Sequence, residues 1–198
     1  MKLNDLQQLD EISLKQAAAA GALGLATLST PAETPHRPSG LAAAGQVRHI
    51  HPRINTMFHE TAAEIAERYR IDRKRAYEIV ALAHKHADPT FPTAHDILSV
   101  IGIESSFNPH AVSSLKRDPA RGLMQVRPGV WGIETAELQD IEKQIKYGVD
   151  ILKGYHNLLK NKWKTLHAYN VGLTKFRKGK RNPEYIEKFK KEHTLHAM

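Results

Sequence analysis

The spacing of apolar residues predicts a series of amphipathic helices from about residue 55 onward. In residues 56–70 and 72–87, apolar side chains recur every three or four positions, the period of one face of a helix. The first stripe comprises Met57, Phe58, Ala62, Ile65 and Tyr69, and the second comprises Ala76, Ile79, Val80, Ala83 and Ala87. We expect both stripes to be buried, with Asp72 capping the second helix.

A third helix is predicted to begin at Thr93, which forms a capping-box pattern with Asp96. Counting by threes and fours places one carboxylate in line with the apolar stripe, which comprises Ile97, Val100, Ile101 and Glu104. Desolvation and the negative end of the helix dipole both favour the protonated form of Glu104. We expect Asn108-Pro109 to end this helix, because a proline disfavours helical geometry at the residue before it.

Three further helices are predicted in the second half of the chain. A long one covers about residues 137–160, and another covers 163–172. The last begins with Asn182 as its cap and Pro183 at its first position. The inward-facing residues are Ile141, Ile145, Val149, Leu152 and Leu159 in the long helix, and Tyr185, Ile186 and Phe189 in the last. Since no alternating strand pattern of useful length is present, the predicted fold class is mainly α.

The N-terminal quarter has a different character, and we expect a flexible arm over residues 1–53 and a folded domain over 54–198. Residues 29–53 mix Pro, Gly and Ser without a period, as linkers do. The apolar run at 17–28 is too short to span a bilayer. It fits a secretion signal cleaved after Ala32, a short Ala-rich helix or mobile arm, or a membrane-active leader on a protein delivered from outside. Acidic residues before the run argue against a standard signal.

The formal net charge of +8 indicates an anionic partner, which could be nucleic acid, an acidic membrane surface or an acidic cell-wall polymer. The chain has no cysteine, so disulfides and thiolate chemistry are excluded. The charge is concentrated in residues 175–181, "KFRKGKR". This run is either a solvated face or a surface attracted to the anionic wall. No recognisable DNA-reading module surrounds it, which disfavours nucleic acid.

Four short motifs occur in order over about residues 90–190: "ESSFNPHAVSS", "GLMQV", "AYNVG" and "NPEYIEKF". Together they resemble the lytic transglycosylase family of soluble murein-degrading enzymes, which are relatives of goose-type lysozyme. The resemblance implies a lysozyme-like α-helical (SLT) domain, peptidoglycan glycan strands as substrate and action in the periplasm or cell envelope. It implies no cofactor and no metal.

The resemblance also implies a role for each matching residue. It makes Glu104 the catalytic acid and base. Ser113 matches a serine that hydrogen-bonds the glutamate or the substrate acetamido group. Met124 and Gln125 match residues that line the cleft beside the reacting sugar.

Three tyrosine and asparagine positions complete the implied site. Tyr169 and Asn170 match a pair that packs against and orients the glutamate, and Tyr185 matches a tyrosine whose hydroxyl lies near the same carboxylate. The loop of residues 115–121 is longer than is usual between these motifs, which leaves its path open. Asp118 in this loop is expected to be a solvated acid paired with Arg117 or Arg121.

The implied reaction needs only one carboxylate, since the 2-acetamido group of N-acetylmuramic acid can stabilise the cationic intermediate. It cleaves the β-1,4 bond to N-acetylglucosamine and leaves 1,6-anhydro ends. Two alternatives stay open. Asp118 could serve as a second carboxylate in a hydrolytic muramidase, or the domain could be a non-catalytic wall-binding component of a phage injection or secretion apparatus. Assembly partners and delivery from a phage virion therefore also stay open.

The remaining histidines and tryptophans are interpreted as structural. His49 with His51, and His84 with His86, are expected to be surface residues, because no further clustered ligands complete a tetrahedral zinc site. Two tryptophans, Trp131 and Trp163, are expected in the core or in the wall of a cleft.

Overall fold

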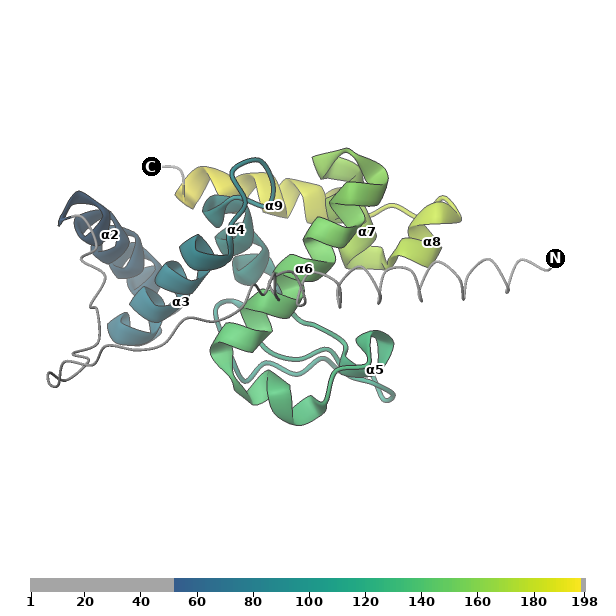
Figure 1. Ribbon diagram of the computed structural model, residues 1–198, viewed down its shortest axis with the longest axis horizontal. Helices are drawn as coiled ribbons and strands as arrows, with labels where there is room; N and C mark the ends of the chain where they lie inside the picture. The colour runs from purple at the N-terminus through teal and green to yellow at the C-terminus, as the bar shows by residue number, and fades with distance from the viewer. Residues whose placement is uncertain (1–51, 197–198) are drawn as a thin grey trace, which may run out of the picture.

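The computed structural model describes residues 52–196, and in this range helices form where the apolar spacing predicts them (Figure 1). The first two are α2 (Pro52–Tyr69) and α3 (Arg73–His86). Asp72 caps α3 as predicted, since its side chain accepts a hydrogen bond from the Arg75 backbone amide at 3.0 Å. The mainly α fold class is confirmed, because the described residues contain only isolated β-bridges and no strand.

Helix α4 (Ala94–Ser105) begins with the predicted capping box. The Asp96 amide donates to Thr93 Oγ1 at 3.2 Å, and the Thr93 amide donates to Asp96 Oδ2 at 2.9 Å. The predicted end at Asn108-Pro109 was wrong. The helix ends instead where Ser106 and Phe107 adopt left-handed conformations, with φ of 52° and 60°. Full burial of the Phe107 ring offsets the small conformational penalty of this turn.

The predicted helix at 137–160 is divided in two. A 3-10 helix, η1, covers Thr135–Gln139, and α6 covers Ile141–Leu159. Asp140 separates them because its side chain accepts a hydrogen bond from the Lys143 amide at 2.8 Å and so starts a new helix. The short helices α5 (Pro128–Trp131) and α8 (Leu173–Arg177) were not predicted, because neither is long enough to show a period.

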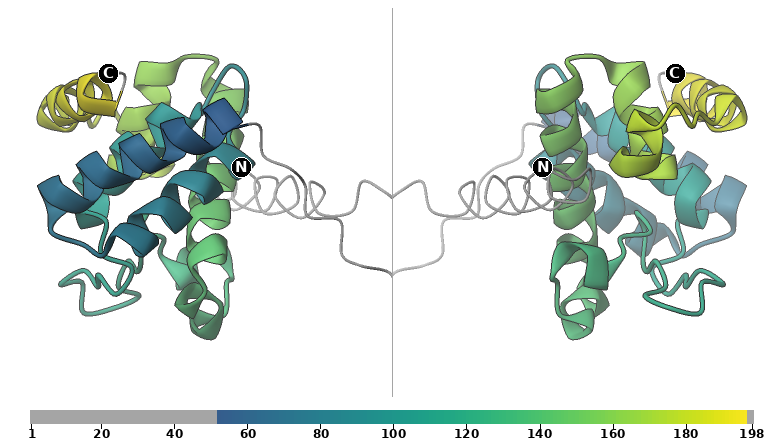
Figure 2. Two further views of the ribbon diagram at one scale, coloured as in Figure 1. Left: turned by 90° about the vertical axis from the view of Figure 1, so that its left-hand side faces the viewer. Right: turned by 90° about the vertical axis from the view of Figure 1, so that its right-hand side faces the viewer.

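Helices α7 (Lys162–Val171) and α9 (Pro183–His196) lie close to their predicted positions. The Asn182 side chain accepts a hydrogen bond from the Tyr185 amide at 3.2 Å, which confirms it as the cap of α9. Helix α9 packs against both α4 and α7. Figure 2 shows α6 running through the domain, with residues 107–134 at one end and α7, α8 and α9 toward the other.

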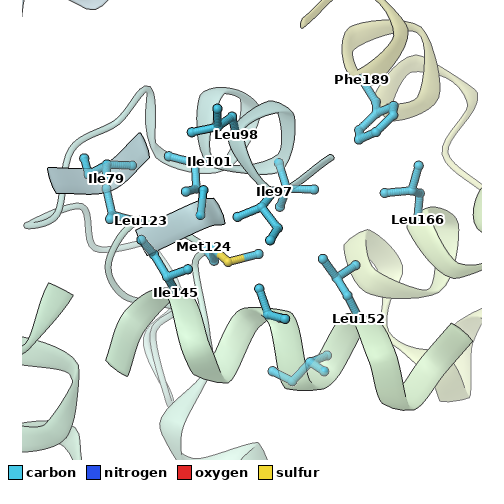
Figure 3. Close-up of a cluster of buried hydrophobic side chains, with 14 of the residues drawn as sticks. Ile79, Ile97, Leu98, Ile101, Leu123, Met124, Ile145, Leu152, Leu166 and Phe189 are labelled. Carbon is cyan, nitrogen blue, oxygen red and sulfur yellow. The ribbon is translucent and has the colours of Figure 1, made fainter. Parts of the chain in front are cut away.

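The hydrophobic core joins α3, α4, α6, α7 and α9 to the segment before α5 (Figure 3). Its fully buried members include Ile79, Ile97, Leu98, Ile101, Leu123, Met124, Ile145, Leu152 and Leu166. A methyl group added at Gly148 would lie 2.4 Å from the Met124 sulfur, so this glycine allows the segment to approach α6 closely. Most residues of the predicted stripes are buried, Tyr69, Ala87, Ile141 and Leu159 are only partly buried, and Met57 is 42% exposed.

Most of the predicted arm, residues 1–51, lies outside the described residues. The interpretations of residues 17–28 and of cleavage after Ala32 therefore stay predictions. Helix α2 begins two residues before the predicted domain boundary. From residue 52 to residue 196, none of the helices has the length and apolar character needed to cross a membrane.

Candidate active site

The last turn of α4 carries Glu104, and α9 supplies its hydrogen-bonding partner. The Tyr185 hydroxyl donates to Glu104 Oε1 at 2.8 Å. Tyr185 is buried and Glu104 is partly exposed, so the acid lies at the edge of the core. The apolar stripe of α4 thus ends in an acid at the margin of the hydrophobic core.

Burial is the main influence on this carboxyl group. It raises the pKa of Glu104 from 4.5 to about 7, and the hydrogen bond from Tyr185 opposes the rise only in part. No lysine, arginine or histidine of the described residues forms an ion pair with Glu104. The group can therefore hold a proton near neutral pH and can also release it.

Tyr169, on α7, connects the surroundings of Glu104 to the loop before α5. Its hydroxyl donates to the Met124 carbonyl oxygen at 2.7 Å. Burial raises the pKa of Tyr169 well above its usual value, and the nearby Glu104 carboxylate adds to the rise. Tyr169 therefore lies close enough to Glu104 to feel its charge, while its hydrogen bond fixes the loop.

Three of the other residues predicted for the site hold the loop in place. The Gln125 side-chain amide donates to the carbonyl oxygens of Ala111 and Gly122 at 3.1 and 3.0 Å. Ser113 Oγ accepts a hydrogen bond from the Ala120 amide at 2.9 Å. The Met124 side chain is fully buried, so a sugar cannot contact it in this structure, and its direct contribution is the carbonyl oxygen bound by Tyr169.

Asn170 lies at the surface and is not bonded to Glu104. Its Oδ1 accepts a hydrogen bond from Asn182 Nδ2 at 2.8 Å, which joins the end of α7 to the start of α9. Because Asn182 also caps α9, and α9 carries Tyr185, any influence of Asn170 on Glu104 passes through the position of α9.

Gln144 was missed by the sequence analysis, although it supports the whole loop. It is 2% exposed and accepts a hydrogen bond from the Leu123 amide at 2.8 Å. Its side-chain amide donates to the carbonyl oxygens of Pro109 and Leu138 at 3.0 and 2.8 Å. The available signal was a polar residue next to Ile145 on the apolar face of α6. Such a residue must be hydrogen-bonded if it is buried.

Asp118 stabilises α5 and does not pair as predicted. Its two carboxylate oxygens accept hydrogen bonds from the amides of Gly129 and Val130 at 2.7 and 3.1 Å. The ion pair expected with Arg117 or Arg121 was wrong, because the partner is Arg127 at 3.4 Å.

The aromatic and histidine predictions had mixed outcomes. Trp131 is partly buried and packs near Tyr155, with ring centroids 5.9 Å apart. Trp163 is 42% exposed, so it is not a core residue. His84 and His86 are partly buried and not at the surface as predicted, since His84 packs against a phenylalanine ring and His86 contacts Glu142 at 3.1 Å; His49 and His51 lie outside the described residues. The part of the chain that the structure describes contains no cluster of three or more side chains able to hold a metal.

Comparison with protein families identifies one match. The model of the transglycosylase SLT domain matches residues 92–191, which is half of the chain and includes every residue predicted for the site. Comparisons with curated proteins and with solved structures gave no match. At the level of the family, the match supports peptidoglycan as the substrate and cleavage of its glycosidic bonds as the general activity, and proteins with this domain act in the cell envelope. The chain therefore belongs to the transglycosylase SLT domain family.

Proposed function

We propose that this protein is a lytic transglycosylase that cleaves the β-1,4 bond between N-acetylmuramic acid and N-acetylglucosamine, with Glu104 as acid and then as base. The observation that carries the proposal is a carboxyl group at the end of the apolar stripe of α4, hydrogen-bonded by Tyr185, whose pKa burial raises to about 7. A general acid works best when its pKa lies near the operating pH, because both protonation states are then within reach.

In the first step, Glu104 donates its proton to the glycosidic oxygen, and the bond from C1 of the muramic acid to that oxygen breaks. The departing N-acetylglucosamine keeps the proton as a hydroxyl group. The oxygen of the 2-acetamido group stabilises the positive charge at C1, in the manner of substrate-assisted glycosidases.

In the second step, the Glu104 carboxylate accepts the proton of the C6 hydroxyl, and O6 forms a bond to C1. The product is a 1,6-anhydro ring, and Glu104 is protonated again for the next cycle. No water is consumed. The Tyr185 hydroxyl stabilises the carboxylate between the two steps, because a hydrogen bond to the charged form favours that form.

The position of Asp118 favours this reaction over hydrolysis. A hydrolytic enzyme of the usual kind has a second carboxylate that acts on the sugar or on a water molecule. Asp118 is the candidate in the loop, but both of its oxygens accept backbone hydrogen bonds at the start of α5. Their role there supports a structural function, and we therefore propose the single-carboxylate mechanism.

The test is digestion of purified sacculi followed by mass spectrometry of the released muropeptides. The wild-type protein should release anhydro ends, which differ from hydrolysed ends by one water, and Glu104→Gln should release almost none. Hydrolysed ends would identify a muramidase instead. Binding to sacculi without release by the wild-type protein would favour a non-catalytic wall-binding component.

The proposal includes two routes to the wall, export from the producing cell or delivery as part of a phage particle or secretion assembly. The apolar run at 17–28 could assist either route through contact with a membrane. Sequencing the N-terminus of the mature protein distinguishes them, because a start near residue 33 would demonstrate export and processing.

A further inference from the structure

A dense group of positive charges covers α8 and the turn after it. We call this group the α8 basic patch, and it comprises Lys175, Arg177, Lys178, Lys180 and Arg181. All five residues are exposed, and residues 172–183 contain no acidic side chain. The backbone brings its ends together, since the Lys180 amide donates to the Lys175 carbonyl oxygen at 3.0 Å.

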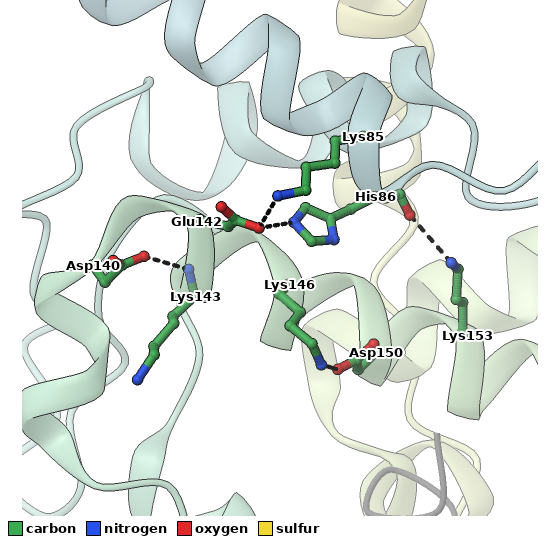
Figure 4. Close-up of polar contacts among 8 residues, drawn as sticks. All are labelled: Lys85, His86, Asp140, Glu142, Lys143, Lys146, Asp150 and Lys153. Atoms are coloured by element: carbon green, nitrogen blue, oxygen red, sulfur yellow. Dashed lines mark hydrogen bonds and ion pairs between the residues drawn. The ribbon is translucent and has the colours of Figure 1, made fainter. Parts of the chain in front are cut away.

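Two lysines around α6, Lys85 and Lys146, are different, because each has a counterion (Figure 4). Lys85 pairs with Glu142 at 2.6 Å, and Lys146 pairs with Asp150 at 2.7 Å. By contrast, none of the carboxylates in the described range forms an ion pair with Lys175, Lys178 or Lys180. These three lysines lie within a segment of six residues. Like charges this close repel, so the patch favours any anion that binds there.

One member of the patch is held rigidly and so gives it a defined shape. The Arg181 guanidinium lies 3.7 Å from the centroid of the Phe176 ring, and it donates to the Phe176 carbonyl oxygen at 2.7 Å. These contacts fasten the turn to α8 and leave the three lysines on a short, ordered segment. Lysine ammonium groups on flexible stems suit carboxylates whose positions vary.

The patch is connected directly to the candidate active site. Asn182 follows Arg181, caps α9 and bonds Asn170, and Tyr185 one turn later donates to Glu104. Helix α8 also packs against α7, which carries Tyr169 (Figure 1). The patch thus adjoins, along the chain, the segment that positions the hydrogen-bonding partner of Glu104.

From this arrangement we propose that the α8 basic patch binds the carboxylates of the peptides attached to muramic acid, and that the protein prefers glycan strands that carry these peptides. The inference rests on the proposed function, because it assumes that the strand binds at Glu104. The inference adds a binding site for the peptides, which lie outside the reacting sugars, and it explains why positive charge is concentrated on α8.

The test compares two substrates, which are glycan strands that carry their peptides and the same strands after an amidase has removed them. Lys175→Gln, Lys178→Gln and Lys180→Gln are combined in one variant, and KM and kcat are measured from the formation of anhydro ends at low salt. On peptide-bearing strands the variant should show a KM about fivefold higher with kcat unchanged, since each exposed ion pair contributes modestly. On stripped strands it should match the wild type.

A second triple variant is the matched control. Arg70→Gln, Arg73→Gln and Lys74→Gln remove the same charge from exposed positions at the turn between α2 and α3, on the far side of Figure 1 from α8. Its KM should remain at the wild-type value on both substrates. An equal rise in KM for the control, or an equal rise on stripped strands, would overturn the proposal in favour of general electrostatic attraction.

Co-sedimentation separates this inference from the proposed function. If no anhydro ends form, the two triple variants are still compared for binding to peptide-bearing and stripped strands. Selective loss of binding to peptide-bearing strands in the α8 variant supports the patch even then. If the α8 variant binds peptide-bearing strands as well as the wild type does, the proposal is overturned. It is also overturned if the α8 variant loses binding only to a duplex oligonucleotide or only to anionic lipid vesicles. Thermal melting followed by circular dichroism verifies that both variants remain folded.

Discussion

Helix α4 carries a buried carboxylate, Asp96, and a partly buried one, Glu104, about two turns apart, and their surroundings differ sharply. Asp96, near the start, is 1% exposed, and its Oδ1 lies 2.6 Å from the Lys162 ammonium and 3.2 Å from His193 Nε2. Glu104, near the end, is bonded to the neutral hydroxyl of Tyr185.

The same two helices create both environments. Helix α7 supplies Lys162 toward Asp96 and Tyr169 toward the surroundings of Glu104, and α9 supplies His193 and Tyr185 in the same way. An acid that forms ion pairs with Lys162 and His193 anchors the fold, whereas an acid bonded to a tyrosine hydroxyl, with its pKa raised to about 7, can hold a proton and exchange it. The comparison predicts that replacing each acid by its neutral amide has a different effect. Glu104→Gln should reduce activity, and Asp96→Asn should reduce stability.

The largest expected effect is on catalysis at the tyrosine end. Glu104→Gln should reduce the rate of anhydro-end formation by about 10³-fold, because an amide can neither donate nor accept the proton. Asp96→Asn is the matched control on the same helix, and it should retain the wild-type rate per folded molecule. If both substitutions reduced the rate equally, the distinction between the two acids would be lost.

The next effect is on stability at the cation end. Asp96→Asn should lower the free energy of unfolding by about 3 kcal/mol, because it leaves the Lys162 ammonium without its buried counterion. Urea denaturation at pH 7 measures the change. Adding Lys162→Met should recover part of the loss, as expected for a coupled pair. A decrease of the same size in Glu104→Gln would contradict the comparison.

A smaller effect concerns the stability of Glu104→Gln. The pKa of Glu104 is higher in the folded protein than in the unfolded chain, so the folded state binds the proton more tightly. The free energy of unfolding of the wild type therefore falls as pH rises from about 4.5 to about 7. A glutamine avoids this loss, and the variant should be more stable than the wild type by about 2 kcal/mol at pH 8. At pH 4 the difference should vanish, and a pH-independent difference would refute this account.

The smallest effect is expected from Tyr185→Phe. Since its hydrogen bond lowers the pKa of Glu104, removing the hydroxyl should raise that pKa further. In the proposed mechanism the activity requires protonated Glu104, so wild-type activity should decline as pH rises through about 7, and in Tyr185→Phe the decline should move to higher pH. The free energy of unfolding should fall by about 1 kcal/mol.

Tyr169→Phe is the control for that measurement. It removes a hydrogen bond to the Met124 carbonyl oxygen, and it should lose similar stability without moving the pH profile. Movement of the Tyr185→Phe profile to lower pH would show that the tyrosine stabilises the protonated acid instead.

The helix starts could be predicted because their signals are local. Asp72, the Thr93–Asp96 pair and Asn182 each bond a backbone amide within three residues, and all three caps occur as the sequence indicates. The end of α4 could not be predicted. Its left-handed turn at Ser106 and Phe107 depends on burial of the Phe107 ring, which is a contact with distant parts of the chain.

The candidate site shows the same division. The position of Glu104 in the apolar stripe was sufficient to predict a raised pKa, since burial is its main cause. The support of the loop by Gln144 and the exposure of Trp163 required the packed structure. Short elements such as α5 also escaped prediction, because four residues carry no period.

By itself, the sequence determined the number of the long helices, the caps of α3, α4 and α9, and the helix face on which Glu104 lies, because periodicity and capping act within a few residues. Only the tertiary structure decided which carboxylate of α4 meets cations and which meets tyrosines. Those partners come from α7 and α9, more than sixty residues along the chain, and the packing of these helices brings them to α4.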